Sequence, residues 1–202
     1  INGLQQLQPG EFLLWDLYKK TIDITRYFKY FPESLSTDTE DQLIEKLNEV
    51  TTNIFKKLIE RLNDRPVWVP LSAGYDSRLI LTMLKKLGYD NVNAFYYGAP
   101  GNRNWERKYS LALAQKLNVP WKHVVFTSKY IHNVFNSKTR KEYGTFADHL
   151  CSLPSYTYMF YLEGLKEHNL LSNNNVMIKG HAGDFISGNH LFDLVTNAPV
   201  EI

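Results

Sequence analysis

The chain has 202 residues, of which 44% are hydrophobic and 22% charged, so it is long enough for one soluble globular domain with a sizeable core. A net charge of +2 excludes a strongly basic nucleic-acid-binding protein and gives no case for attraction to an anionic membrane. No apolar stretch approaches the ~18 residues of a membrane-spanning helix. The one basic cluster, Lys138-Thr139-Arg140-Lys141, is interpreted as a solvated surface turn.

The cysteine content and the two chain ends indicate the cellular compartment and the extent of the chain. Cys151 is the single cysteine, which excludes an intrachain disulfide and predicts a reducing, cytoplasmic location. The chain opens at Ile1 without a methionine, and residues 197–202 do not resemble a natural end. We therefore expect the chain to be part of a longer protein. The sequence leaves the oligomeric state open, with a homodimer as one candidate.

Two short apolar runs near the start predict an antiparallel β ribbon. The turn signal Pro9-Gly10 precedes the run 11–15, and a second run follows at 22–28. Pro32 then ends regular structure. We expect residues 1–36 to form this ribbon and a linker, and residues 37–202 to form the main domain.

A long amphipathic helix is predicted next. Thr37 and Glu40 have the spacing of a capping box. Apolar residues then recur every three or four positions until Pro66, with Lys and Glu between them. The predicted apolar face consists of Leu43, Leu47, Val50, Ile54, Leu58 and Leu62.

Beyond Pro66, short apolar strands alternate with helices. Helices are predicted at 78–87 and 104–117, and a longer helical region at about 143–170 is broken by Pro154. Alternation of this kind predicts an α/β fold with a doubly wound, mainly parallel sheet and right-handed crossovers. The predicted strands lie at 67–71, 92–97, 121–126 and 176–178.

The most informative segment is the run from Leu71 to Arg78, between the first parallel strand and its helix. Its small residues allow the backbone to wrap around an anion, with successive N–H groups and the helix dipole facing phosphate oxygens. Ser72 and Ser77 add hydroxyl donors, and Asp76 implies a bridging magnesium ion. The pattern is neither a G-x-x-x-x-G-K-[ST] loop nor a dinucleotide fingerprint. A tight strand-to-helix turn without a ligand is the alternative.

The run Ser72-Ala73-Gly74-Tyr75-Asp76-Ser77 resembles the S-G-G-x-D-S loop of the N-type ATP pyrophosphatases, the PP-loop superfamily. These enzymes cleave ATP between its α- and β-phosphates and hold the departing pyrophosphate with this loop. Ala73 replaces the more usual glycine, a change that a tight turn accommodates. The resemblance implies an adenine nucleotide alpha-hydrolase-like fold.

Three further segments resemble the asparagine synthetase branch, so the resemblance covers nearly the whole chain. The segment 7–28 is similar to the junction between the glutaminase and synthetase domains of that family. Residues 95–98, with Glu106, are similar to its second-strand region, which packs near adenine. The run 180–189 is similar to its later G-x-G-x-D-x-x-x-G-G loop.

The resemblance implies where ATP and Mg²⁺ bind. In this fold the first and fourth parallel strands are neighbours where strand order reverses, so the loops after both meet at one crevice. Asp76 and Asp184 are implied to face the same magnesium ion. Leu71 and Tyr97 are implied to contact the nucleoside, and Gly180 to lie near the activated carboxylate. The phosphates are implied to lie along the loop formed by Ser72, Ala73, Gly74, Tyr75, Asp76 and Ser77.

Two residues depart from the family pattern. His181 stands where asparagine synthetases generally have glutamate and β-lactam synthetases tyrosine. It is either a general base, alongside Asp76 and Asp184 in the expected catalytic set, or a loop histidine of no consequence. Its presence weakens the inference that the substrate is aspartate. Phe185 follows Asp184 where an acidic residue is usual.

The implied reaction is amide formation by a carbon–nitrogen ligase with glutamine as amido donor. A small carboxylate reacts with ATP to give an acyl-adenylate and pyrophosphate, and ammonia from a glutaminase domain then attacks. The family's later catalytic lysine falls beyond Ile202, so the chain alone is expected to bind ATP without turning it over. Two alternatives remain: another PP-loop enzyme, such as a tRNA-modifying enzyme or an NAD or GMP synthetase, and a nucleotide-binding module that has lost catalysis. The acid itself is open: aspartate, a sugar acid and a peptide carboxylate all fit.

Other candidate residues are interpreted as structural. Cys151 is not N-terminal and is expected to be a buried thiol. The run Asp148-His149-Leu150-Cys151 lacks partners at zinc spacing. The aromatic series Tyr156, Tyr158, Phe160 and Tyr161 is expected to pack a helix rather than to stack on bases.

Overall fold

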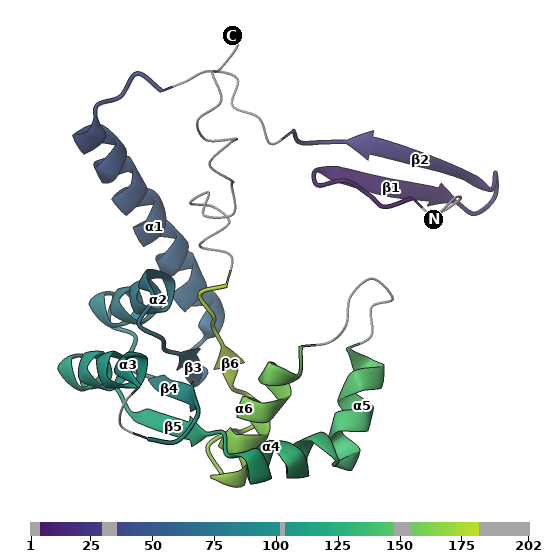
Figure 1. Ribbon diagram of the computed structural model, residues 1–202. Helices are drawn as coiled ribbons and strands as arrows, with labels where there is room; N and C mark the ends of the chain where they lie inside the picture. The colour runs from purple at the N-terminus through teal and green to yellow at the C-terminus, as the bar shows by residue number, and fades with distance from the viewer. Residues whose placement is uncertain (1–4, 30–35, 102–103, 148–154, 182–202) are drawn as a thin grey trace, which may run out of the picture. The chain divides into compact units, whose positions relative to one another are not determined.

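The computed structural model describes residues 5–29, 36–101, 104–147 and 155–181. The chain divides into two compact units, residues 1–47 and 48–202, and the division falls inside the first helix. Figure 1 labels the two strands of the ribbon, β1 and β2, and the four strands of the sheet, β3 to β6. Each unit is described by itself.

The ribbon of the first unit confirms the predicted pairing. Strands β1 (Glu11–Asp16) and β2 (Thr21–Arg26) are antiparallel, with Glu11 opposite Arg26. The carboxylate of Glu11 and the guanidinium of Arg26 lie 2.6 Å apart across this pair. Gly10 has a φ of +80°, and a Cβ there would lie 2.0 Å from the carbonyl oxygen of Phe28. The turn therefore requires glycine.

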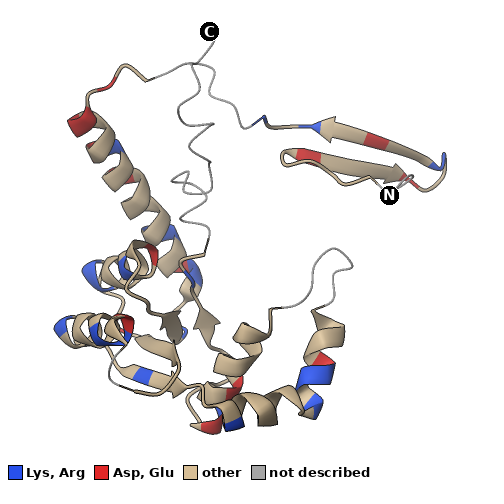
Figure 2. Ribbon diagram, viewed as in Figure 1, with Lys and Arg blue, Asp and Glu red and all other residues tan. Residues whose placement is uncertain are grey.

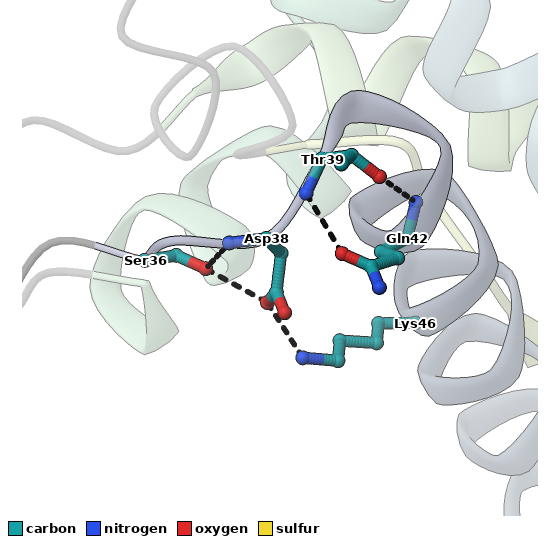
Figure 3. Close-up of polar contacts among 5 residues, drawn as sticks. All are labelled: Ser36, Asp38, Thr39, Gln42 and Lys46. Atoms are coloured by element: carbon teal, nitrogen blue, oxygen red, sulfur yellow. Dashed lines mark hydrogen bonds and ion pairs between the residues drawn. The ribbon is translucent and has the colours of Figure 1, made fainter.

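Helix α1 (Glu40–Leu62) begins with a capping box, two residues later than predicted. The Thr39 N–H donates to Gln42 Oε1 at 2.9 Å, and the Gln42 N–H donates to Thr39 Oγ1 at 3.4 Å (Figure 3). Such reciprocal bonds satisfy two N–H groups that a helix start otherwise leaves free. The predicted pair Thr37 and Glu40 is therefore wrong, because Glu40 already lies within the first turn.

The buried face of α1 differs in part from the predicted one: Leu58 and Leu62 pack on the core as predicted, but the residues nearer the helix start do not. In the second unit, Val50 and Ile54 are 55% and 58% exposed, whereas Phe55 and Leu62 are buried. Leu58 and Ile59 complete a stripe with the i, i+3, i+4, i+7 spacing of one helix face. Only the last two turns of α1 thus pack on the core of this unit.

The sheet of the second unit has four parallel strands in the order β5-β4-β3-β6. The strands are β3 (Val67–Pro70), β4 (Val92–Gly98), β5 (Trp121–Val125) and β6 (Val176–Met177). Successive strands lead from β3 to β5, and the chain then returns to place β6 on the other side of β3. This confirms the predicted α/β, doubly wound parallel sheet, with a reversal of strand order at β3.

Side-chain alternation along the strands produces two cores, one on each face of the sheet. Val67 and Val69 face the last turns of α1, together with α2 (Tyr75–Lys86) and α3 (Trp105–Lys116). Trp68 and Phe95 face α6 (Tyr156–Glu167) on the opposite side. Each fully buried Val or Leu contributes about 1.5–3 kcal/mol of transfer free energy. The helices therefore cover both faces, as a parallel sheet requires.

The starts of two helices differ from the sequence-based prediction. Helix α4 (Ser128–Phe135) is capped by the Thr127 side chain and α5 (Lys138–Phe146) by Ser137, each accepting an N–H of the first turn. The basic run 138–141 forms the start of α5 rather than a turn, and its cations are visible there in Figure 2. The Ser137 cap explains the difference, because it lets a helix begin within a polar run.

Within the part of the chain that the structure describes, no helix is both long and apolar enough to cross a membrane.

The packing of α6 on β5 predicts a strong requirement for Gly164. A Cβ there would lie 2.4 Å from Val124 Cγ1 and 3.1 Å from the Tyr130 hydroxyl. Gly164→Ala should lower the free energy of unfolding by about 1–3 kcal/mol because of this overpacking. In the control Gly144→Ala, the added Cβ meets a single hydroxyl 3.3 Å away and gains helix propensity, so stability should be nearly unchanged. Equal stability of both variants in urea titrations would contradict this packing.

Candidate functional site

A cavity of about 370 Å³ opens at the carboxyl edge of the sheet, where strand order reverses. Its walls come from the segments after β3 and β6, the end of β4, and helices α3 and α6. The lining residues are Pro70, Leu71, Ser72, Gly74, Asp76, Ser77, Tyr96, Tyr97, Glu106, Tyr158, Tyr161, Lys179, Gly180 and His181. Segments from both ends of the domain thus share one cavity.

Hydrogen bonds between two serines shape the loop after β3. The Ser72 N–H donates to Ser77 Oγ at 3.1 Å, and the two hydroxyl oxygens lie 3.1 Å apart. The Gly74 N–H donates to Ser72 Oγ, also at 3.1 Å. Ser77 is only 5% exposed, so its side chain is held inside the turn. The loop is therefore fixed by its own polar groups.

The first turn of α2 presents N–H groups toward this loop. Gly74 is the N-cap residue, and no side-chain hydrogen bond caps this helix start. The first N–H groups of a helix lack intrahelical partners and carry the positive end of the helix dipole. Asp76 is half-buried beside them, and its carboxylate makes no ion pair or hydrogen bond with the described residues. This combination suits an anion together with a hard cation.

Gly180, which follows β6, touches this helix start. A Cβ on Gly180 would lie 2.7 Å from Asp76 Cβ and 2.8 Å from the Ser77 nitrogen. Because neither the Ser77 nitrogen nor a Cβ bonded directly to the backbone can easily move, these distances leave no room for any side chain. The glycine therefore lets the segment after β6 approach the loop after β3.

Aromatic rings line the other side of the cavity. The ring of Tyr161 lies 5.2 Å from that of Tyr97 and 5.8 Å from that of Tyr158. Burial raises the pKa of Tyr97 and, more strongly, that of Tyr161, so both phenols stay neutral. The ammonium nitrogen of Lys179 lies 3.3 Å from the centre of the Tyr158 ring. This wall combines flat apolar surfaces with one cation.

A polar group at the end of β4 joins the cavity to α3. Asn104 caps α3 and donates through Nδ2 to the Tyr96 hydroxyl at 2.6 Å. That hydroxyl in turn donates to Glu106 Oε2 at 3.4 Å. Burial is the main cause of a raised pKa at Tyr96, and the charge of Glu106 adds to it. Glu106 is thereby held at the cavity margin.

Comparisons with known proteins identify the family. The family model described as asparagine synthase matches residues 56–194, most of the chain. The chain belongs to the asparagine synthase family. No curated protein gives a significant match.

One solved structure that is similar to this member of the asparagine synthase family is an NH₃-dependent NAD synthetase from Campylobacter jejuni subsp. jejuni NCTC 11168, in complex with the nitrate ion. The sequence identity is 19% and the TM-score is 0.47. The match covers 71% of this chain and 59% of that one, so the chain spans less than two thirds of the synthetase's length.

Most of the residues expected from the sequence lie together in this asparagine synthase-family domain. Leu71, Ser72, Gly74, Asp76, Ser77, Tyr97, Gly180 and His181 all line the cavity. Ala73 and Tyr75 do not line it: the Tyr75 side chain is 83% exposed and lies under the Arg78 guanidinium, 4.4 Å from the ring centre. Asp184 and Phe185 lie outside the described residues, as do Asp148, His149 and Cys151.

Three residues that line the cavity, Lys179, Tyr158 and Tyr161, were not placed in the site by the sequence patterns. Tyr161 does pack in the core, as expected for helix packing, but it also lines the cavity. Strand alternation is the signal that could have placed Lys179. Val176 and Ile178 face the α2 side and Met177 the α6 side, so Lys179 falls on the α6 side with the tyrosines.

His123, on β5 beside the Tyr96 ring, predicts a pH dependence of stability. Burial, and then the charge of Arg107, lowers its pKa below the ordinary 6.5. The unfolded chain therefore binds this proton more tightly, and the free energy of unfolding should fall as pH drops below about 6.5. Urea titrations at several pH values should show a shallower fall for His123→Gln. The control variant His168→Gln, at an exposed position, should show the same fall in the free energy of unfolding as the wild type. If His123→Gln also shows the wild-type fall, His123 is not its cause.

Proposed function

We propose that this chain is the ATP-binding synthetase domain of an amide-forming ligase, which activates a carboxylate as its adenylate and releases pyrophosphate. Membership of the asparagine synthase family supports the reaction class. The observation that carries the proposal is the contact of Gly180 with Asp76 and Ser77, which joins two loops into one cavity.

ATP is proposed to lie across this cavity. Its phosphates meet the loop of Ser72, Gly74 and Ser77, where uncapped N–H groups and the dipole of α2 favour negative charge. Its nucleoside lies toward Leu71 and Tyr97, because these side chains supply the apolar and aromatic surface that a purine ring requires. The charged and flat parts of ATP thus match the two walls.

The residues present also fit a magnesium ion. Asp76 offers a carboxylate without a protein partner among the described residues, beside the hydroxyl groups of Ser72 and Ser77. Magnesium prefers one or two carboxylates together with phosphate oxygens, and we propose Asp184 as the second carboxylate. When bound, the ion would offset the charge of the leaving pyrophosphate.

The proposed reaction needs positioning rather than a protein nucleophile. A carboxylate oxygen attacks the α-phosphorus and pyrophosphate leaves; ammonia then attacks the acyl carbon, giving the amide and AMP. The loop after β3 holds the phosphates in line, and the walls exclude water. His181, which lines the cavity from its exposed side, is proposed to accept the proton that the amine loses.

The ammonia is proposed to come from glutamine, through a glutaminase domain acting with this one. His181 distinguishes the chain from enzymes that have glutamate at this position. We therefore propose a small carboxylate as the substrate without specifying that it is aspartate. A module that binds ATP without catalysis is the second candidate function, favoured by His181 and Ala73.

Magnesium-dependent ATP binding tests the site directly. Calorimetry should show that Asp76→Asn weakens ATP binding about tenfold or more in magnesium, because a charged contact is lost. The difference should disappear when EDTA removes the metal. Asp90→Asn is a matched control, since that carboxylate is exposed and pairs with Lys85 away from the cavity. Equal affinities of wild type and Asp76→Asn in magnesium would refute the metal site.

Pyrophosphate release tests the reaction itself. The intact protein that carries this chain is supplied with ATP, magnesium, ammonia and a panel of amino, sugar and peptide carboxylates. The proposal predicts pyrophosphate release that depends on one class of acid. ATP binding without release for any acid would identify the non-catalytic module instead.

A further inference from the structure

Lys179 is a cation of the cavity, and it has no acidic partner among the residues that the structure describes. No described carboxylate lies within ion-pair distance of its ammonium, although Asp76 and Glu106 line the same cavity. The ammonium instead lies 3.3 Å from the centre of the Tyr158 ring, whose face attracts cations. The half-buried side chain is thereby held in place while its N–H donors stay available to a ligand.

Lys179 lies next to both walls of the cavity, the loop after β3 and the aromatic wall. The next residue, Gly180, would place a Cβ 2.8 Å from the Ser77 nitrogen, so the Lys179 backbone adjoins the phosphate-binding turn. Its side chain lies on the α6 side, with Tyr158. Lys179 thus lies where the proposed phosphate-binding loop meets the aromatic wall of the cavity.

In an adenine nucleotide, the group between the base-bearing sugar and the terminal phosphates is the α-phosphate. If the nucleoside lies on the aromatic wall and the terminal phosphates on the serine loop, the α-phosphate comes to this junction. Its oxyanion would otherwise face Asp76 and Glu106, two carboxylates that repel it. A fixed ammonium at the junction offsets that repulsion.

We propose that Lys179 binds the α-phosphate of the nucleotide and is held for this task by the ring of Tyr158. The proposal rests on the ATP-binding function argued above and adds a residue to it. By pairing with the α-phosphate oxygens, Lys179 would lower the charge that the attacking carboxylate must approach. The reacting carboxylate is the other oxyanion that the same cation could bind.

The test compares AMP with adenosine, which differs by that one phosphate. In calorimetry with the whole chain, Lys179→Met should weaken AMP binding roughly ten- to a hundredfold, the range for loss of a charge-assisted hydrogen bond. Adenosine affinity should stay unchanged, because methionine keeps the length and apolar stem of lysine. Lys179→Arg should restore most of the AMP affinity. Lys166→Met, on the exposed side of α6 where lysine pairs with Glu163, is the matched control.

Three outcomes would overturn the proposal. The first is equal AMP affinity in Lys179→Met and wild type. If the carboxylate substrate, titrated without nucleotide, then binds Lys179→Met more weakly than wild type, that carboxylate is the partner of Lys179 instead. Parallel losses for AMP and adenosine would show a merely structural role. Failure of the wild type to bind AMP or ATP would refute the ATP-binding function as well, which separates the two claims.

A second variant tests the ring. Tyr158→Leu keeps apolar bulk but removes the face that holds the ammonium. It should weaken AMP binding in the wild-type background and have little further effect in Lys179→Met, because both changes remove one interaction. Additive losses in the double variant would contradict the coupling.

Discussion

The close approach of Gly180 to the first turn of α2 is the constraint on which the site depends. Because a side chain at position 180 would collide with Asp76 and with the Ser77 nitrogen, the segments after β3 and β6 share one cavity only if this residue is glycine. Parallel pairing of β3 with β6 brings them to the same edge. The serine hydrogen bonds then set the shape of the turn on one side. Two distant segments of sequence thus make one wall.

Local patterns were sufficient to predict the parallel sheet, whereas the reversal of strand order was implied by the family resemblance. Short apolar runs bounded by Pro and Gly mark strands buried on both faces, and this pattern arises directly from parallel packing. The loop from Ser72 to Ser77 was predicted to bind phosphate because of its resemblance to the PP-loop motif, since its small residues alone also fit a tight turn without a ligand. The resemblance to the asparagine synthetase family then indicated that the later segment at Gly180 belongs with it, and both line the cavity.

Other features of the structure were harder to predict from the sequence, most of them because they depend on tertiary contacts. The shift of the buried face of α1 to Phe55 depends on which turn meets the sheet, which periodicity alone does not define. The start of α1 was misplaced for a local reason, because the capping box forms between Thr39 and Gln42 instead of between Thr37 and Glu40. Helix α5 begins in a basic run that composition assigns to solvent. The pairing of Lys179 with Tyr158 joins residues 21 positions apart through the register of β6 and the docking of α6. These packing events follow from the fold and not from a motif.

The central claim, that both loops meet one nucleotide, is tested most directly by amide chemical shifts in an isotope-labelled chain titrated with ATP and magnesium. The account predicts that the amides of residues 72–77 and of 179–181 shift together, with one common dissociation constant. Shifts confined to the first group, with 179–181 unmoved at saturation, would contradict a shared site.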